Sequence, residues 1–158
     1  MTVTIRAAVA RDLPAVSVLA GLLVRQHHEF DAQRFMLIPG VEAGYARFFE
    51  TQLPDPAVSI LVAERDSVIV GYAYARLEPR DWNSLLDVSG ALHDVFVSEA
   101  ARRQGVARLL VDAVRGELRE KGAPRLVLHT ASKNATAREF FAALGFRETM
   151  VELTNELK

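Results

Sequence analysis

The sequence predicts an α/β protein with a mixed, mostly antiparallel central sheet flanked by helices. Three observations carry this prediction. Two β-rich runs, 59–64 and 68–77, are separated only by residues 65–67, which predicts an antiparallel hairpin. Residues 91–131 show strand, helix and strand patterns in turn, which predicts a crossover between parallel strands. The length of 158 residues fits a single domain, 1–158, with one core.

The part of the chain before the hairpin predicts one strand and two helices. Alternating residues 3–7 predict the strand. Asp12 fits a helix N-cap, and the apolar residues from Leu13 to Leu23 then form one helical stripe. The polar stretch 25–34 ends that helix or loops out of it. A second helix is predicted near 42–53, before two prolines that stop it.

The clearest helix of the second half is 106–121, because its apolar residues recur at i, i+3 and i+4. Gly122 sits where a glycine commonly ends a helix. The other elements are expected as a loop 79–90, a strand 91–97, a buried strand 125–131, a short helix 136–144 and one or two strands within 146–157.

Composition excludes several functional classes. The formal charge of −1 gives no electrostatic footprint of a nucleic-acid binder. The absence of cysteine excludes a disulfide framework, a thiol nucleophile and a thiolate metal site, and it fits a reducing compartment. No apolar run approaches the roughly 18 residues of a membrane span, and the first residues do not resemble a signal peptide. We therefore expect a soluble, cytoplasmic protein that binds neither membranes nor nucleic acid.

The segment 92–110 predicts a strand, a turn and a helix that opens at a glycine. Helix N-termini expose unpaired N–H groups with partial positive charge, so an anion binds there. Gly105 and the small Ala107 allow a phosphate to approach the backbone, and Arg102 and Arg103 add positive charge. Alternatively, the segment is an ordinary strand-to-helix turn with a solvated arginine pair.

A second motif lies one strand and one loop downstream, at 134–146. The two motifs read Arg102-x-x-Gly105-x-Ala107 and Asn134-x-x-Ala137-x-x-Phe140-Phe141-x-x-x-Gly145-Phe146. In this order and spacing they resemble the GNAT superfamily of acetyl-CoA-dependent N-acetyltransferases. The resemblance covers essentially the whole chain. It implies the GNAT acyl-CoA N-acyltransferase fold and transfer of an acetyl group from acetyl-CoA to a primary amine.

The resemblance also implies which residues hold the coenzyme. The end of the strand would pair with the pantetheine arm, and the loop N–H groups would hold the pyrophosphate. Asn134 would contact the pantetheine or help to splay two parallel strands, although it could simply cap the next helix. The implied set is Val95, Phe96, Val97, Arg102, Arg103, Gln104, Gly105, Val106, Ala107, Asn134 and Phe141.

Acetyl transfer to an amine needs a base that removes a proton from the amine and a hydrogen-bond donor that stabilises the oxyanion. The coenzyme leaves as a thiolate. Strand alternation places His93 and Asp94 on opposite faces, so at most one of them points into the site. We prefer Asp94 for a catalytic or water-positioning role; the alternative is a structural carboxylate that caps backbone groups. His129 is a further titratable candidate, or a core histidine. The resemblance implies a backbone N–H near Val95 as the oxyanion donor. It also implies a tyrosine acid where this chain has Phe141. Water or another residue, such as Tyr45, Tyr72 or Tyr74, would then protonate the thiolate, or the thiolate would leave unprotonated.

The region between the first two helices usually shapes the acceptor pocket in this family. The resemblance therefore implies substrate contacts from His27, His28, Phe35, Tyr45 and Trp82, with Arg34 nearby. The alternative is an ordinary solvated segment. We expect no metal here, because adjacent histidines point apart on a helix and no spaced partner set appears.

Two rival functions and one assembly state complete the predictions. A non-catalytic acyl-CoA-binding or sensing module is the alternative function, since Phe141 lacks the acidic hydroxyl. A nucleotide-binding oxidoreductase is weaker, because the loop lacks the third small residue and the acidic partner about 20 residues on. The alternating segment 150–153 predicts a homodimer, because edge strands readily pair with a second subunit.

Overall fold

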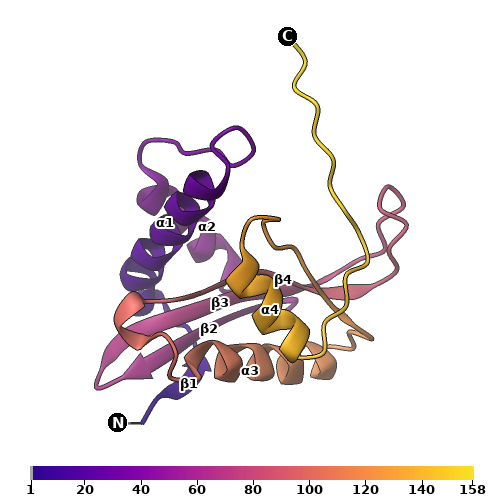
Figure 1. The fold of residues 1–158 in the computed structure, drawn as a ribbon. Coiled ribbons are helices and arrows are strands. Elements are labelled where there is room, and N and C mark those ends of the chain that lie inside the picture. The colour runs from indigo at the N-terminus through magenta and orange to yellow at the C-terminus, as the bar shows by residue number, and fades with distance from the viewer. Residues whose placement is uncertain (1) are drawn as a thin grey trace.

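A five-stranded sheet forms the centre of the protein in the computed structural model, which describes residues 2–158 (Figure 1). The strands lie in the order β1-β2-β3-β4-β5. The pairs β1–β2, β2–β3 and β3–β4 are antiparallel, and β4–β5 is parallel. The predicted mixed, mostly antiparallel sheet is therefore confirmed. The strands are β1 (Thr4–Ala7), β2 (Val58–Arg65), β3 (Val68–Glu78), β4 (Ser89–Val97) and β5 (Leu126–Leu128).

Four α-helices flank this sheet: α1 (Leu13–Phe30), α2 (Val41–Gln52), α3 (Val106–Glu120) and α4 (Ala135–Ala143). Two short 3-10 turns, Ala10–Asp12 and Glu99–Ala101, lead into α1 and toward α3. No helix of the described residues is long and apolar enough to cross a membrane.

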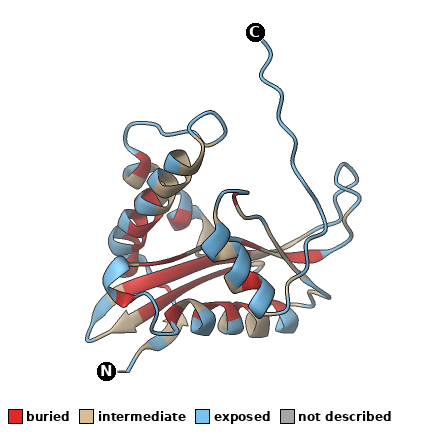
Figure 2. Ribbon diagram, in the orientation of Figure 1, coloured by how far each residue is buried: buried red, intermediate tan, exposed pale blue. Residues whose placement is uncertain are grey.

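Strand alternation divides the core into two layers, one on each face of the sheet. Ala73 and Ala75 of β3 belong to the layer that packs under α3. Tyr72 and Tyr74 of the same strand belong to the layer beneath α1 and α2. Figure 2 shows the buried centre of the sheet and the more exposed outer faces of the helices. The tyrosines therefore face the α1/α2 side.

The entry into α1 is held by an ionic network centred on Arg6. Its guanidinium donates to the Asp12 carboxylate at 2.7 and 3.0 Å and to Glu64 of β2 at 2.7 Å. Asp12 is 5% exposed and also accepts the Val9 N–H at 2.9 Å. The hydrogen bonds from Arg6 lower the pKa of Asp12. The Arg6 guanidinium thus joins the first strand to the turn through Asp12 and to the hairpin through Glu64.

Helix α1 ends at Phe30, inside the polar stretch 25–34 that was expected to end this helix or loop out of it. Two other element predictions differ from the structure. Strand β5 covers three residues and is only half-buried, where 125–131 was expected as a buried strand. The predicted strands within 146–157 are wrong: residues 146–158 form no helix or strand, and the chain from 147 extends away from the body with exposed side chains (Figures 1 and 2). Alternation alone does not make a strand when no neighbouring strand supplies hydrogen bonds.

Candidate functional site

The two parallel strands of the sheet pair over only part of their length. The β4–β5 register runs from Gly90 opposite Leu126 to Leu92 opposite Leu128 and stops there. Strand β4 continues to Val97, paired with β3 alone. The last five residues of β4 therefore present an edge without a β5 partner. Such an edge can accept an extended chain as an added strand.

A β-bulge sets the direction of the two candidate bases on β4. The β3–β4 register shifts between Tyr74, opposite Asp94, and Ala75, opposite Leu92, so His93 is the extra residue. The His93 ring stacks on Tyr74 at 5.4 Å, and the Tyr72 hydroxyl donates to Asp94 at 2.9 Å. Both tyrosines face α1 and α2, so both candidates lie on that face. The expectation of opposite faces was wrong, because a bulge breaks strand alternation.

Asp94 is the half-buried carboxylate of this face. Burial raises its pKa, whereas the hydrogen bond from Tyr72 acts in the opposite direction. Burial and then the charge of Asp94 raise the pKa of Tyr45 to about 12. A charge on His27 of α1 in turn lowers the pKa of Asp94, after the contributions of burial, Tyr72 and His93. Side chains from α1, β3 and β4 thus influence the pKa of this carboxylate, and its charge in turn influences Tyr45 of α2.

The other two candidate bases, His93 and His129, are both exposed to solvent. The Nε2 atom of His93 lies 2.9 Å from the Glu78 carboxylate, and its ring is exposed. His129 follows β5 and is exposed, so the alternative of a core histidine was wrong. Asp94 is therefore the candidate best shielded from solvent.

The loop between β4 and α3 leaves the start of α3 open. Gly105 is the residue before α3, with φ +79°, and no side chain caps this helix. Arg103 also has a positive φ of 60°. A Cβ atom built on Gly105 would meet no atom within 4 Å. The first turn of α3 thus has no side-chain cap, and the space beside Gly105 is open, which suits an anion.

Side chains brace this loop instead of filling it. Arg102 folds back onto β4: its Nε donates to the Val97 carbonyl at 3.0 Å, and its guanidinium lies 5.3 Å from the Phe96 ring centre. Arg65, at the end of β2, donates to the Gln104 side chain at 2.6 Å. Sequence reasoning missed Arg65, because nothing local in the chain indicates that the hairpin end reaches this loop.

Helix α4 carries the second motif. The Asn134 side chain caps it by accepting the Ala137 N–H at 3.1 Å, which is the alternative role considered for this residue. Phe141 is 7% exposed and packs edge-on against Phe140 and Phe146, with centroid distances of 5.0 and 5.5 Å. Phe141 thus belongs to the layer of core beneath α3.

Two of the three tyrosines considered as acids, Tyr72 and Tyr74, have hydroxyl groups that are already hydrogen-bonded. Tyr72 is fully buried and its hydroxyl is engaged by Asp94. The Tyr74 hydroxyl donates to Gln52 at 2.8 Å. Burial is the first cause that raises the pKa of both groups. Neither hydroxyl is free to donate elsewhere.

Three of the five predicted acceptor contacts gather at the end of α1 and the loop after it. His27 Nδ1 donates to the Leu23 carbonyl at 2.8 Å, and its ring packs edge-on against Phe35 at 5.0 Å. His28 Nδ1 donates to the Phe35 carbonyl at 2.8 Å. Tyr45 packs on Phe49 at 5.4 Å.

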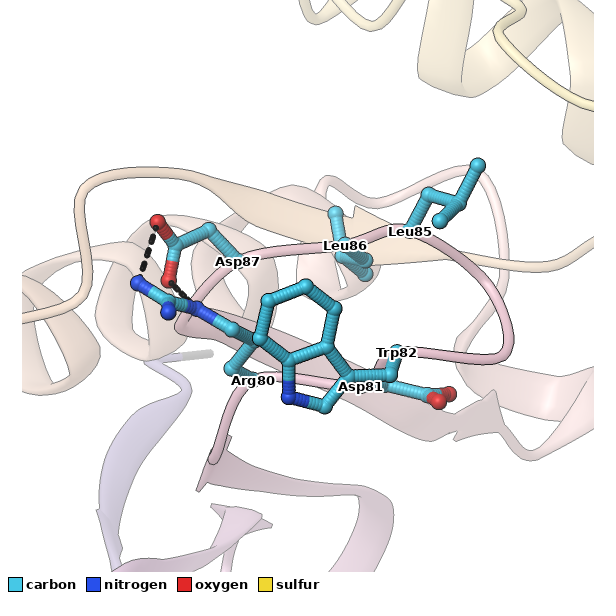
Figure 3. A pocket seen from close by; sticks show the side chains of 6 residues that line it. All are labelled: Arg80, Asp81, Trp82, Leu85, Leu86 and Asp87. Atoms are coloured by element: carbon cyan, nitrogen blue, oxygen red, sulfur yellow. Dashed lines mark hydrogen bonds and ion pairs between the residues drawn. The ribbon is translucent and has the colours of Figure 1, made fainter.

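Trp82 lies elsewhere, in the loop between β3 and β4 (Figure 3). Its ring is 75% exposed and lies 5.4 Å from the Arg80 guanidinium. Residues 80–87 of this loop alone line the hollow beside it. The structure does not bring Trp82 together with the other four residues. Across residues 2–158, no group of three or more acidic or histidine side chains is placed to hold a metal ion.

Comparison with known proteins gives a family match. The model of the Acetyltransferase (GNAT) family matches residues 24–146. This stretch contains the open loop, Asp94 and the second motif.

Individual proteins are also similar. The chain is 28% identical to mycothiol acetyltransferase of Thermomonospora curvata over 99 residues, 63% of this chain and 31% of that protein. It is 32% identical to human N-acetyltransferase 8 over 88 residues, 56% of this chain and 38% of that protein. These matches therefore span about a third of each relative's length. The solved structure of AAC(6')-Iy with the bisubstrate analogue CoA-S-monomethyl-acetylneamine has a TM-score of 0.80 at 23% identity, covering 100% of this chain and 99% of that one.

Proposed function

The chain belongs to the acetyltransferase (GNAT) family, and on this premise we propose that it transfers the acetyl group of acetyl-CoA directly to a primary amine. One observation carries the proposal. The loop 98–105 leads from a β4 edge that has no β5 partner to the uncapped start of α3. One element suits a phosphate and the other an extended amide-bearing chain, and coenzyme A contains both in that order.

The coenzyme-binding residues follow from this arrangement. The free edge of β4 at Val95, Phe96 and Val97 would pair with the pantetheine amides. The N–H groups from Arg102 to Ala107 would hold the pyrophosphate. Arg102 acts by bracing the loop, since its side chain is bound to the Val97 carbonyl. Asn134 acts through the start of α4, and Phe141 through packing.

Asp94 is proposed as the group that accepts the proton of the acceptor amine. A neutral amine attacks the thioester carbonyl carbon, the new C–N bond forms, and the C–S bond breaks. A carboxylate whose pKa is raised by burial is a better base than a solvated one. Tyr72 orients it through the 2.9 Å hydrogen bond. A backbone N–H near Val95 would stabilise the oxyanion.

The leaving thiolate does not require a protein acid. Phe141 has no proton to donate, and the hydroxyls of Tyr72 and Tyr74 are engaged by Asp94 and Gln52. Thiol pKa values lie near 8.5, so a thiolate can leave unprotonated or take a proton from water. The acceptor would lie on the α1/α2 side, near His27, His28, Phe35 and Tyr45.

A thiol-release assay with acetyl-CoA and a panel of primary amines tests the proposal. We expect acetyl-CoA-dependent thiol release with at least one amine, and a loss of about a hundredfold or more in Asp94→Asn. Binding of acetyl-CoA without turnover on any amine would instead favour the sensing module that the missing hydroxyl of Phe141 allows.

A further inference from the structure

The tip of the β2–β3 hairpin lies against the loop 98–105 and holds both ends of that loop (Figure 1). At the first residue of the loop, the Ser98 N–H donates to the Val70 carbonyl at 2.8 Å. Near its last residue, Arg65 Nη1 donates to the side-chain oxygen of Gln104 at 2.6 Å. The loop proposed to hold the pyrophosphate is therefore supported by a segment that is distant in sequence, since Arg65 lies 39 positions before Gln104.

The hairpin gives this support a fixed starting point. Its turn consists of Asp66 and Ser67, which both have a positive φ, 51° and 64°. A two-residue turn of this kind matches the twist of the strands that it joins. Arg65 is the last residue of β2 and pairs with Val68 across the turn. Strand pairing thus fixes the backbone of Arg65, and only its side chain must be ordered to reach the loop.

Gln104 is the residue through which the loop receives this support. Its neighbours Arg103 and Gly105 have φ values of 60° and 79°, both in the left-handed region. That region is unfavourable for a residue other than glycine, so Arg103 keeps this conformation only because surrounding contacts hold it. The Gln104 amide group also donates to the Ala100 carbonyl at 3.2 Å. Gln104 therefore links the hairpin to the two left-handed residues just before α3.

We propose that Arg65 is a positioning residue for coenzyme binding: by holding Gln104, it keeps the loop 98–105 ordered before the pyrophosphate arrives. The inference rests on the proposed function, because it concerns the coenzyme loop of the same site. A loop that is already ordered loses less conformational entropy when its ligand binds, so it binds more tightly than a mobile one. This role requires no contact between Arg65 and the reacting atoms. The loss of Arg65 should therefore weaken coenzyme binding and leave kcat unchanged.

Isothermal calorimetry with CoA compares two matched variants. Arg65→Met removes the hydrogen-bond donor but keeps most of the apolar stem, and we expect the affinity for CoA to fall about fivefold. Arg80→Met is the control, because Arg80 also contacts one side chain, Asp87 at 3.0 Å, and follows the opposite end of β3. It should leave the affinity unchanged. An unchanged affinity in Arg65→Met, or an equal loss in Arg80→Met, would overturn the inference.

A double-mutant cycle shows whether Arg65 acts through Gln104. Gln104→Ala removes the acceptor, so it should weaken CoA binding by itself, and adding Arg65→Met should cause no further loss. Additive losses would overturn the inference in favour of a direct ion pair between Arg65 and a phosphate group. Full affinity in Gln104→Ala would also contradict it. Similar melting temperatures of Arg65→Met and Arg80→Met would show that the loss of affinity does not come from unfolding.

The outcomes separate this inference from the proposed function. If the protein binds CoA but acetylates no amine, non-additive losses in the cycle would leave the role of Arg65 standing and remove the transferase. If an amine is turned over, the KM for acetyl-CoA should rise about fivefold in Arg65→Met at unchanged kcat. Turnover with a wild-type KM in this variant would leave the transferase and remove the role of Arg65.

Discussion

Asp12 holds the Arg6 guanidinium, and Arg6 in turn reaches Glu64, which lies 58 positions away on β2. Asp12 is 5% exposed, receives both ends of the Arg6 guanidinium and accepts the Val9 N–H. Asparagine at this position would leave Arg6 with Glu64 alone. We expect Asp12→Asn to lower the free energy of unfolding by about 2–3 kcal/mol, measured by urea denaturation near pH 6.

The pH dependence of this loss provides its control. The pKa of Asp12 is lowered in the folded state, so its contribution to stability is present above the unfolded value near 3.8 and lost as the pH falls through the folded value. The difference between wild type and variant should narrow as the pH drops below about 4. Asp87→Asn removes an exposed ion pair with Arg80 and should cost less than about 1 kcal/mol. A difference that persists unchanged at pH 2.5 would contradict the ionic origin.

The positions of single site residues were predictable where a sequence motif determines them. They were not predictable where contacts between distant segments determine them. Gly105 was expected at the start of a helix and is found there with a positive φ. The direction of His93 could not be predicted, because one bulged residue reverses the alternation and no local pattern announces it. Arg65 was missed because its partner Gln104 lies 39 positions away.

At the scale of elements, α3 offers a test of the phosphate-binding loop at both of its ends. Gly105 precedes the helix with φ +79°, and Gly122 follows it with φ +94°; a Cβ atom on either would meet nothing within 4 Å. Alanine at either position should therefore cost about 1–2 kcal/mol of stability through backbone strain. Only Gly105→Ala places its methyl group where the pyrophosphate is proposed to bind.

We expect Gly105→Ala to weaken CoA binding by about tenfold, or about 1.4 kcal/mol, with Gly122→Ala unchanged. Isothermal calorimetry gives the affinities, and thermal melting gives the matched stability losses. Equal affinities of the two folded variants for CoA would remove the loop from the coenzyme site. Valine is less informative at this position, because a β-branched residue at positive φ would distort the loop itself.

The elements with a strong internal period were predicted best. Helix α3 was expected at 106–121 and spans Val106–Glu120, because its apolar stripe is dictated by the sequence alone. Strand β5 is three residues long where seven were expected, since strand length depends on the neighbour and β4 diverges after Leu92. The segment after Phe146 alternates but has no partner strand, and it forms none.

At the scale of the whole molecule, the sheet separates two chemical environments. Helices α3 and α4 pack on one face, and α1 and α2 cover the other, where Phe49, Tyr72 and the carboxylate of Asp94 lie. The loop before α3 lies at the end of β4, so the proposed coenzyme route runs along this strand toward the carboxylate. The mixed sheet and its helices were predictable from the order of the elements. Which side chains lie on which face was not predictable, because it depends on the register between neighbouring strands.

The C-terminal tail exposes apolar side chains that no other part of the chain covers. Its apolar side chains Met150, Val151, Leu153 and Leu157 are 75%, 76%, 90% and 91% exposed. Its Glu152 forms a bidentate ion pair with Arg34, including a 2.8 Å bond from Nη2, and both side chains are exposed. Because an exposed ion pair contributes about 1 kcal/mol at most, this contact does not account for an ordered apolar segment.

We propose that a second copy of the chain covers the tail and that the protein is a homodimer. Light scattering at micromolar concentration should then give twice the 17.5 kDa of one chain. In a monomer, deleting residues 150–158 would remove one exposed ion pair and leave stability nearly unchanged. In a dimer, the same deletion should halve the mass, lower the melting temperature and abolish the dependence of the melting temperature on protein concentration.

Glu152→Gln is the control, because it removes the pair with Arg34 but keeps the apolar side chains, and it should remain dimeric. A mass that stays at 17.5 kDa as concentration rises would refute the dimer, since the exposed apolar segment would then be stable in solvent on its own.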